Sequence, residues 1–161
     1  TMQRTGLFIP LILTLLLTFA VADCRDVAPV FPSGRVPWQS YARPDIGFTL
    51  DVPAGFEAEQ LGDDTVFRYG GFPILRVILV DAEAARTRGL WATSQPIGQV
   101  QVGGQTADVY AYDHQDLFTY THTLAYVLPR GDKQLGIEFR TANDTLDATE
   151  QRILNSFQFT P

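Results

Sequence analysis

Short segments in which apolar and polar residues alternate are the feature that most constrains how this chain folds. Phe48, Leu50 and Val52 alternate with polar residues, which is the period of two expected for a strand with one buried face. The run 74–80 is instead apolar at nearly every position, which predicts a central strand covered on both faces. Because the chain has one cysteine, no internal disulfide is available and packing alone must stabilise the fold.

Turn residues join further strand patterns into hairpins. Two adjacent glycines, Gly103 and Gly104, separate the strand patterns 97–102 and 106–112 and supply the positive φ angles of a tight turn. A second hairpin is expected to join 119–128 to 134–141 across the turn 129–132. A short strand is also expected at 66–69.

The chain changes from strand to helix periodicity near its C-terminal end. Leu146, Ile153, Leu154 and Phe157 share one helical face, and Asp147 with Glu150 forms a capping-box pattern. We therefore expect a helix at 147–155, and a second, short helix at 81–88. The predicted fold class is α+β: an antiparallel sheet of about six strands, with the C-terminal helix and the short additional helix packed on it.

The first 22 residues have the pattern of a secretory signal peptide. Arg4 precedes an apolar run at 7–19, and Ala20-Val21-Ala22 is a small-residue cleavage signature. An uncleaved membrane anchor is the less favoured alternative, because the run contains Pro10 and is shorter than the ~20 apolar residues of a spanning helix. The sequence thus predicts a periplasmic or secreted protein.

Cys24, directly after this segment, leaves two mature forms open. Residues 21–24 resemble a bacterial lipobox, in which the cysteine is lipidated and anchors the protein to a membrane. Asp23 departs from the pattern, since small residues are usual at that position. The alternative is cleavage after Ala22, which gives a soluble protein beginning at Asp23.

Prolines near its start and an acidic net charge characterise the chain after residue 22. Pro29, Pro32 and Pro37 disfavour helix and sheet pairing, so we expect a Pro-rich tether at 23–40 and a folded domain at 41–161. Removing residues 1–22 removes one basic residue and changes the net charge from −6 to −7. An acidic domain is repelled by phosphate backbones and anionic lipids, so nucleic acid is not expected as a partner, and contact with a membrane is expected only through Cys24.

Three segments carry a resemblance to a known family: 47–56 (GFTLDVPAGF), 103–110 (GGQTADVY) and 153–159 (ILNSFQF). They are similar, in this order, to the opening strand, the middle strand and the end of PsbP-like domains. The three occur in the family's order and extend over the whole expected domain. This resemblance implies the fold shared by PsbP, Mog-type proteins and DcrB-like bacterial envelope proteins, an antiparallel sheet with packed helices. It also implies a scaffold for binding that is not generally enzymatic, and bacterial members that are often exported. The matching positions are turn glycines and core aromatics, so the resemblance assigns no functional residue.

Histidines and aspartates near the second hairpin are the strongest metal-ligand candidates. His114 lies between Asp113 and Asp116, and His122 follows on the next expected strand, where a hairpin would bring it close. No thiolate and no helical His-x-x-x-His spacing supports a metal site. The plainer interpretation is a solvated loop beside a hydrogen-bonded strand histidine.

Other residue patterns carry weaker chemical hypotheses. Four tyrosines concentrate on two adjacent expected strands, where they either line a ligand groove or pair across the sheet. They are Tyr110, Tyr112, Tyr120 and Tyr126. No serine lies in a Gly-x-Ser-x-Gly turn, and the carboxylates of Glu57, Glu59, Asp63 and Asp64 cluster near a glycine as solvated loops do.

No pattern in the chain reaches the specificity of a catalytic motif, and none implies a cofactor. We therefore expect a non-catalytic exported domain that binds a protein partner or a small ligand. One alternative is a metal-dependent hydrolase that uses His114 and His122. The other is a structural spacer in the cell envelope, suggested by the tether.

Mass spectrometry of the mature N-terminus distinguishes the two processed forms. A diacylglyceryl mass on Cys24 is expected for the lipoprotein. Its acyl chains would contribute about 0.8 kcal/mol per buried methylene to membrane binding. An unmodified chain that begins at Asp23 is expected for the soluble form, and either result excludes the other.

Overall fold

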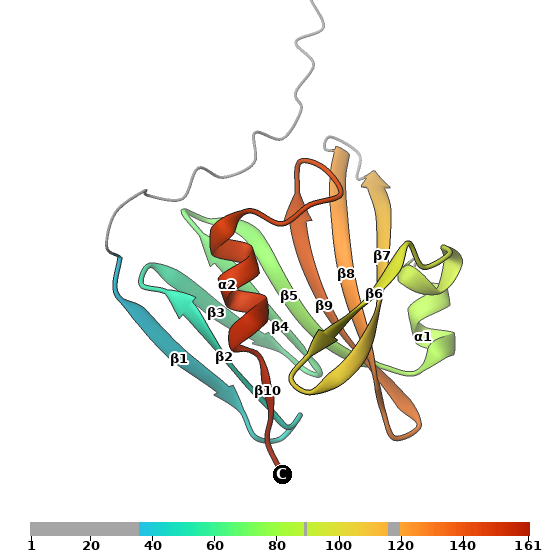
Figure 1. Ribbon diagram of the computed structural model, residues 1–161, viewed down its shortest axis with the longest axis horizontal. Coiled ribbons are helices and arrows are strands. Elements are labelled where there is room, and N and C mark those ends of the chain that lie inside the picture. The colour runs from blue at the N-terminus through green and yellow to red at the C-terminus, as the bar shows by residue number, and fades with distance from the viewer. Residues whose placement is uncertain (1–35, 89, 116–119) are drawn as a thin grey trace, which may run out of the picture.

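Two antiparallel sheets and two α-helices make up the computed structural model over the residues that it describes, 36–88, 90–115 and 120–161 (Figure 1). The strands are β1 (Trp38–Arg43), β2 (Phe48–Pro53), β3 (Phe56–Leu61), β4 (Asp64–Tyr69), β5 (Phe72–Val80), β6 (Gly98–Val102), β7 (Gln105–Gln115), β8 (Tyr120–Arg130), β9 (Lys133–Thr141) and β10 (Gln158–Phe159). The helices are α1 (Ala82–Thr87), α2 (Ala148–Ser156) and the 3-10 helix η1 (Trp91–Thr93).

The fold is broadly α+β, but the expected single sheet of about six strands is wrong. The large sheet has seven strands in the order β3-β4-β5-β9-β8-β7-β6, and the small sheet has three in the order β1-β2-β10. The strands that the sequence did not reveal lie at sheet edges. In β3 only Phe56 is buried, and in β1, which begins inside the predicted tether, only Arg43 is buried, so neither shows a clear apolar alternation.

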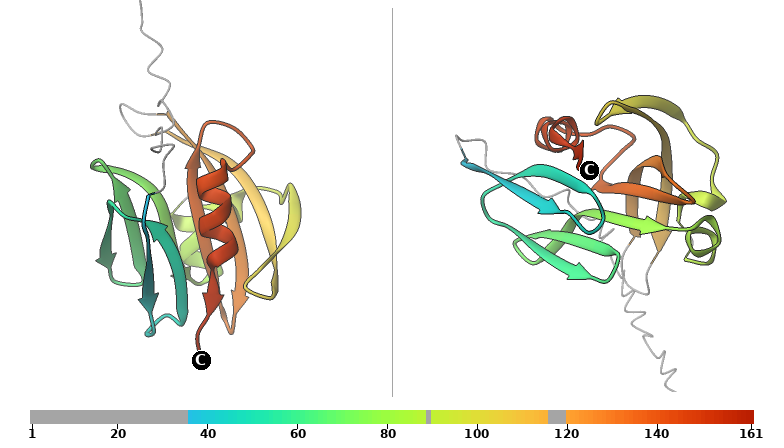
Figure 2. Two further views of the ribbon diagram at one scale, coloured as in Figure 1. Left: turned by 60° about the vertical axis from the view of Figure 1, so that its left-hand side comes forward. Right: turned by 90° about the horizontal axis from the view of Figure 1, so that it is seen from below.

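The main core lies between the large sheet, the small sheet and α2. Figures 1 and 2 show α2 beside the small sheet and over one face of the large one. The predicted helix at 147–155 is confirmed within one residue at each end, and its capping box between Asp147 and Glu150 is present. Phe157, directly after α2, stacks on Phe48 of β2 with ring centroids 5.6 Å apart.

The opposite face of the large sheet carries a second, smaller core under α1 and η1. β5 contributes to both cores, Leu75 and Val77 to the first and Ile78 and Val80 to the second, as predicted for a strand covered on both faces. The short helix expected at 81–88 is also confirmed, since the Asp81 side chain accepts a hydrogen bond from the backbone N–H of Ala84 at the start of α1.

Trp91 fills this second core because β9 has a glycine beneath it. A Cβ atom at Gly136 would lie 2.3 Å from the indole ring, so only glycine lets the ring approach the strand. The indole nitrogen donates a hydrogen bond to Oε1 of Gln134, at 2.9 Å. The buried indole therefore keeps a partner for its polar N–H.

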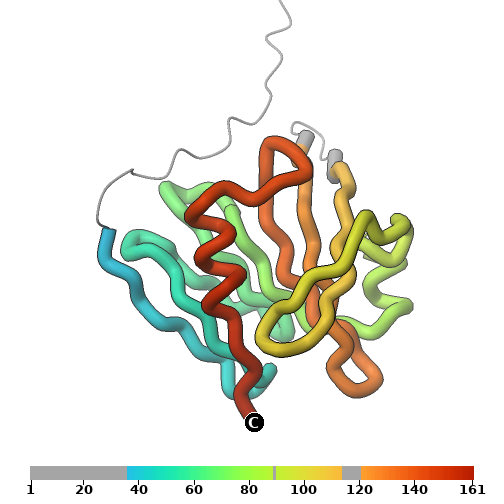
Figure 3. The backbone as a smooth tube through the Cα atoms, viewed as in Figure 1, coloured from blue at the N-terminus to red at the C-terminus, as the bar shows by residue number. Residues whose placement is uncertain are grey.

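The N-terminal region predicted from the sequence is only partly described. The predicted signal peptide, Cys24 and the tether up to residue 35 lie outside the described residues. No helix within the described ranges is both long and apolar enough to cross a membrane. Segments from the two ends of the described chain meet in the small sheet, where β2 lies between β1 and β10 (Figure 3).

Phe157→Ala is expected to lower the free energy of unfolding by about 3–5 kcal/mol, because this side chain is 1% exposed and stacks on Phe48. Urea denaturation measures the change. Phe72→Ala serves as the control, since Phe72 is 64% exposed and its loss should change the stability by less than about 0.5 kcal/mol. An unchanged midpoint for Phe157→Ala would show that the end of α2 is not docked.

Candidate functional site

A polar cleft lies on the face of the large sheet that carries α1 and η1. Its volume is about 270 Å³. Its lining residues are Arg76, Arg88, Leu90, Tyr112, Thr121, Thr123, Glu138 and Arg140. They come from four neighbouring strands and from the segment between α1 and η1, so the sheet register determines the arrangement of most of them.

Cross-strand pairing places the polar side chains next to one another. Arg76 of β5 is opposite Glu138 of β9, and Thr123 of β8 lies between its pairing partners Tyr112 and Arg140. Side chains directly opposite each other in adjacent strands have Cβ atoms about 5 Å apart, which is within reach for these long polar groups.

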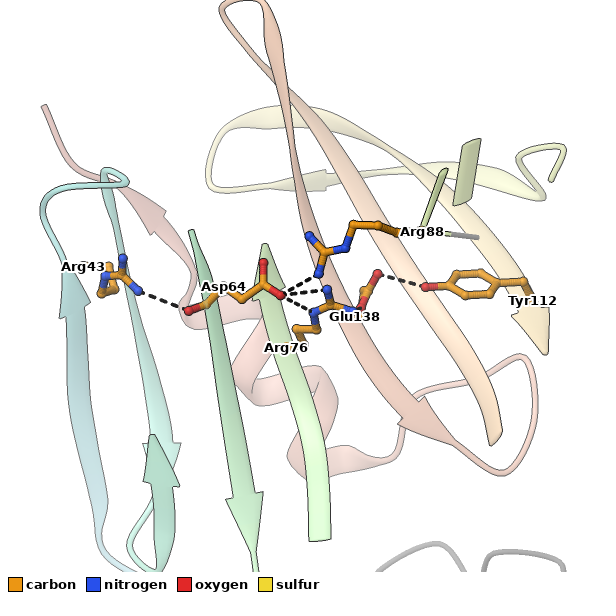
Figure 4. A network of polar contacts seen from close by, with 6 residues as sticks. All are labelled: Arg43, Asp64, Arg76, Arg88, Tyr112 and Glu138. Atoms are coloured by element: carbon orange, nitrogen blue, oxygen red, sulfur yellow. Dashed lines mark hydrogen bonds and ion pairs between the residues drawn. The ribbon is translucent and has the colours of Figure 1, made fainter. Parts of the chain in front are cut away.

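One carboxylate oxygen joins two of the arginines (Figure 4). Oδ2 of Asp64 accepts hydrogen bonds from Nη2 of Arg76 and from Nη2 of Arg88, both at 2.8 Å. Nη1 of Arg76 also contacts Oε2 of Glu138 at 3.3 Å, and the hydroxyl of Tyr112 donates to Oε1 of Glu138 at 2.9 Å. The result is one continuous network from Arg88, directly after α1, across β4, β5 and β9 to β7.

Arg43 holds the other side of the turn that carries Asp64. Its side chain is 4% exposed, and Nη1 donates to the backbone carbonyl of Asp64 and to Oγ1 of Thr65. Nη2 donates to the carbonyl of Gly62, while Asp45 accepts from both Nε and Nη2. The guanidinium therefore connects β1 of the small sheet to the β3–β4 turn of the large sheet.

Positive charge predominates in the cleft. Three guanidinium groups line it with the carboxylate of Glu138, and the Asp64 carboxylate pairs with two of the three, so a net positive charge remains although the chain as a whole has a net charge of −6. Burial raises the pKa of Glu138, and the neighbouring guanidinium of Arg76 opposes that shift. Burial and the nearby Glu138 carboxylate raise the pKa of Tyr112, so its hydroxyl stays protonated and donates to Glu138.

The structure brings together two of the four metal-ligand candidates. His122 and Asp113 are cross-strand partners, and Nδ1 of His122 lies 2.7 Å from Oδ1 of Asp113. Nε2 lies 2.8 Å from Oδ1 of Asp144, so both ring nitrogens already contact carboxylates. The side chain of His114 and all of Asp116 lie outside the described structure. Among the described residues, no group of three or more His, Cys, Asp or Glu side chains is placed to hold a metal ion.

The described tyrosines do not share one groove. Tyr110 and Tyr112 pack against the second core, whereas Tyr126 lies in the main core on the opposite face, edge-on to Phe139. The side chain of Tyr120 lies outside the described structure. Of the predicted set, Tyr112 alone among the described side chains lines the cleft.

The four clustered carboxylates also separate. Glu57 and Glu59 lie on the exposed strand β3, and Asp63 is 61% exposed with its side chain 3.6 Å from Lys133. Asp64 is 14% exposed and belongs to the arginine network.

Sequence reasoning missed the arginines of the cleft and Glu138. Arg76 interrupts the apolar run 74–80, and Glu138 and Arg140 share one face of the strand pattern at 134–141. Charged residues in strands that are otherwise buried were the available signal, because such charges are rarely buried unless they are paired.

Comparison with known proteins identifies the fold. No family model and no curated protein matches the sequence. A protein from Bacteroides thetaiotaomicron superposes with a TM-score of 0.55 at 11% identity, over 76% of this chain and 48% of the other, so the chain spans about half of that protein's length. Cyanobacterial PsbP from Synechocystis superposes with a TM-score of 0.53 at 18% identity, over 83% of this chain and 98% of the other. The expected PsbP-like fold is thus confirmed, while a relation to Mog-type or DcrB-like proteins stays a prediction.

A smaller hollow of about 150 Å³ lies at the start of α2 and is bordered by Glu150. This side chain is 5% exposed, and its Oε2 accepts a hydrogen bond from the backbone N–H of Asp147. Burial raises the pKa of Glu150 to about 7, even though this hydrogen bond favours the ionised form.

The raised pKa of Glu150 predicts that stability falls as the pH rises. Because the folded-state pKa lies near 7 and the ordinary value is 4.5, the folded protein binds this proton more tightly than the unfolded chain does. The free energy of unfolding should therefore decrease between about pH 4.5 and 7, by about 1–2 kcal/mol after allowance for solvent screening.

Glu150→Gln isolates this effect, since glutamine keeps the capping acceptor but does not titrate. Urea denaturation of both proteins from pH 4.5 to 8 should show the decrease in the wild type and its loss in the variant. Parallel pH profiles for the two proteins would contradict the assignment to Glu150.

Proposed function

We propose that this protein is a non-catalytic exported domain whose cleft binds a small molecule through a carboxylate or phosphate group. The single observation that carries the proposal is the presence of three guanidinium groups around one cleft of about 270 Å³ in a chain with a net charge of −6. Arginine is the side chain best suited to planar, bidentate recognition of such oxyanions.

Arg88 is the side chain best placed to meet an incoming anion. It is 41% exposed, and among the described residues its guanidinium makes one bond, to Asp64, so N–H donors are left for a ligand. The Asp64 carboxylate keeps the guanidiniums of Arg76 and Arg88 close together before a ligand arrives. Donors positioned in advance reduce the entropy that binding costs.

The side chains of the cleft favour binding over catalysis. The Glu138 carboxylate accepts a bond from Tyr112 and contacts Arg76, so it is poorly placed to act as a general base. The hydroxyl of Thr121 accepts a hydrogen bond from Arg140, and no serine or cysteine is among the described residues that line the cleft. The volume is at or below the lower end of the usual range for ligand pockets, which favours a small ligand or one end of a larger one.

Export and a relation to DcrB-like proteins are part of the same proposal. A PsbP-like fold, the predicted signal peptide and the binding cleft together favour an exported binding protein of the DcrB-like kind. The metal-dependent hydrolase receives less support, because both nitrogens of His122 contact carboxylates.

Titration calorimetry with inorganic phosphate and with citrate tests the proposal, with glucose as the uncharged comparison. We expect millimolar or tighter dissociation constants for the two anions that weaken as salt is added, and no heat from glucose. Arg88→Gln should weaken anion binding at least tenfold.

Arg86→Gln is the matched control. Arg86 lies in the last turn of α1, two residues before Arg88. It is 61% exposed and pairs with Glu83 outside the cleft. The control should bind both anions as the wild type does, and thermal unfolding should show that both variants stay folded. Equal weakening in the two variants, or anion binding that Arg88→Gln leaves unchanged, would refute the cleft as the site.

A further inference from the structure

The two edges of the large sheet differ in how they are protected. At the β3 edge, Gln39 of β1 donates to the backbone carbonyl of Phe56 at 3.3 Å, and Arg43 donates to that of Gly62 at 3.0 Å. The strand itself carries Glu57 and Glu59. Covering contacts and charged side chains are the devices by which proteins keep edge strands from pairing with other chains.

Along β6 we find neither device among the residues that the structure describes. Residues Gly98–Val102 include no charged residue and no proline, and four of the five are exposed. Within the described structure, β6 pairs with β7 alone. Side-chain bonds from Gln99 to Asp108 and from Gln101 to Thr106 hold this strand pair in register, at 2.7 and 2.8 Å. The outer edge of β6 therefore has no strand partner within the described ranges, and its strand is held in register with β7.

Exposed apolar side chains accompany this edge. Ile97, just before β6, is 56% exposed, and Val100 is 40% exposed. Val100 and Val102 are two residues apart and so face the same side of the sheet. Val102 is buried in the main core, so the apolar face of the sheet continues to its edge. A strand added beside β6 would cover Val100.

We propose that the β6 edge binds an extended segment of a partner protein by strand addition, with an apolar side chain beside Val100 and basic side chains on the opposite face. Backbone hydrogen bonds supply affinity in this mode, and alternate side chains supply specificity. Asp108 is the only charged residue between 98 and 112, and it lies on the face of the glutamines, so a basic side chain complements it.

A second copy of this chain is the less suitable occupant. Two chains that each carry a net charge of −6 repel one another. A five-residue strand spans about 17 Å, so pairing two such strands buries less surface than the about 1,200–2,000 Å² of a stable interface. A flexible segment of a partner pairs with the whole of so short an edge, because it adds as a single strand and needs no second folded surface.

Two nine-residue peptides test the proposal on the purified domain, one alternating valine and lysine and the other alternating valine and glutamate. Fluorescence anisotropy should show binding of the lysine peptide and at least tenfold weaker binding of the glutamate peptide. Amide hydrogen exchange should slow in β6 when the lysine peptide is present, and exchange in β3 should not change.

Val100→Lys and Leu61→Lys separate the two sheet edges. Leu61 is 52% exposed on β3, so its substitution introduces the same charge at the protected edge. Val100→Lys should weaken binding of the lysine peptide at least tenfold, whereas Leu61→Lys should change that affinity less than twofold. Equal binding of the two peptides, or equal effects of the two variants, would overturn the proposal. A concentration-dependent dimer in sedimentation that Val100→Lys abolishes would assign the edge to a second copy and would also overturn it.

Discussion

The buried guanidinium of Arg43 is the interaction on which both the packing of the sheets and the cleft depend. Removing a charge from water costs several kcal/mol unless the group is paired and its donors are satisfied. Here Asp45, Thr65 and two backbone carbonyls accept from it. The hydrogen bond from Arg43 also lowers the pKa of Asp45 to about 2, so the partner stays ionised. Because these bonds fix the β3–β4 turn, they also fix the point from which the Asp64 side chain reaches Arg76 and Arg88.

The two faces of the large sheet divide stability and recognition between them. On one face, apolar residues from both sheets and α2 exclude water and supply the hydrophobic stabilisation. On the other face, an apolar cluster lies beneath α1 and Trp91, and the arginine network lies beside it. A buried carboxylate such as Glu138 is weak evidence for stability, since its desolvation offsets much of its attraction to Arg76. Such groups are concentrated at binding sites, where a defined arrangement of charge is useful.

The sequence predicted what repeated side-chain patterns encode and missed what tertiary contacts create. Strand β5 and helix α2 were recognisable because many of their residues are buried at regular intervals. Edge strands such as β3 bury too few side chains to produce a pattern. The cleft was hidden for a different reason, since Asp64 and Glu138 are far apart in the chain and meet through β5. Tyr112 was singled out correctly as a residue of interest, but its separation from Tyr126 depends on which face each strand position occupies.

The pairing of β2 with β10 has a consequence for when the protein can fold during synthesis. Phe48 is opposite Phe159, and the backbone N–H of Thr160 donates to the carbonyl of Gly47, so the small sheet joins opposite ends of the domain. Contacts between residues so distant in sequence raise the contact order and slow folding. The small sheet and the core beneath it cannot close until β10 has left the ribosome. Until β10 has been made, β2 lacks this pairing partner and the main core stays open, which favours the binding of chaperones to the incomplete domain.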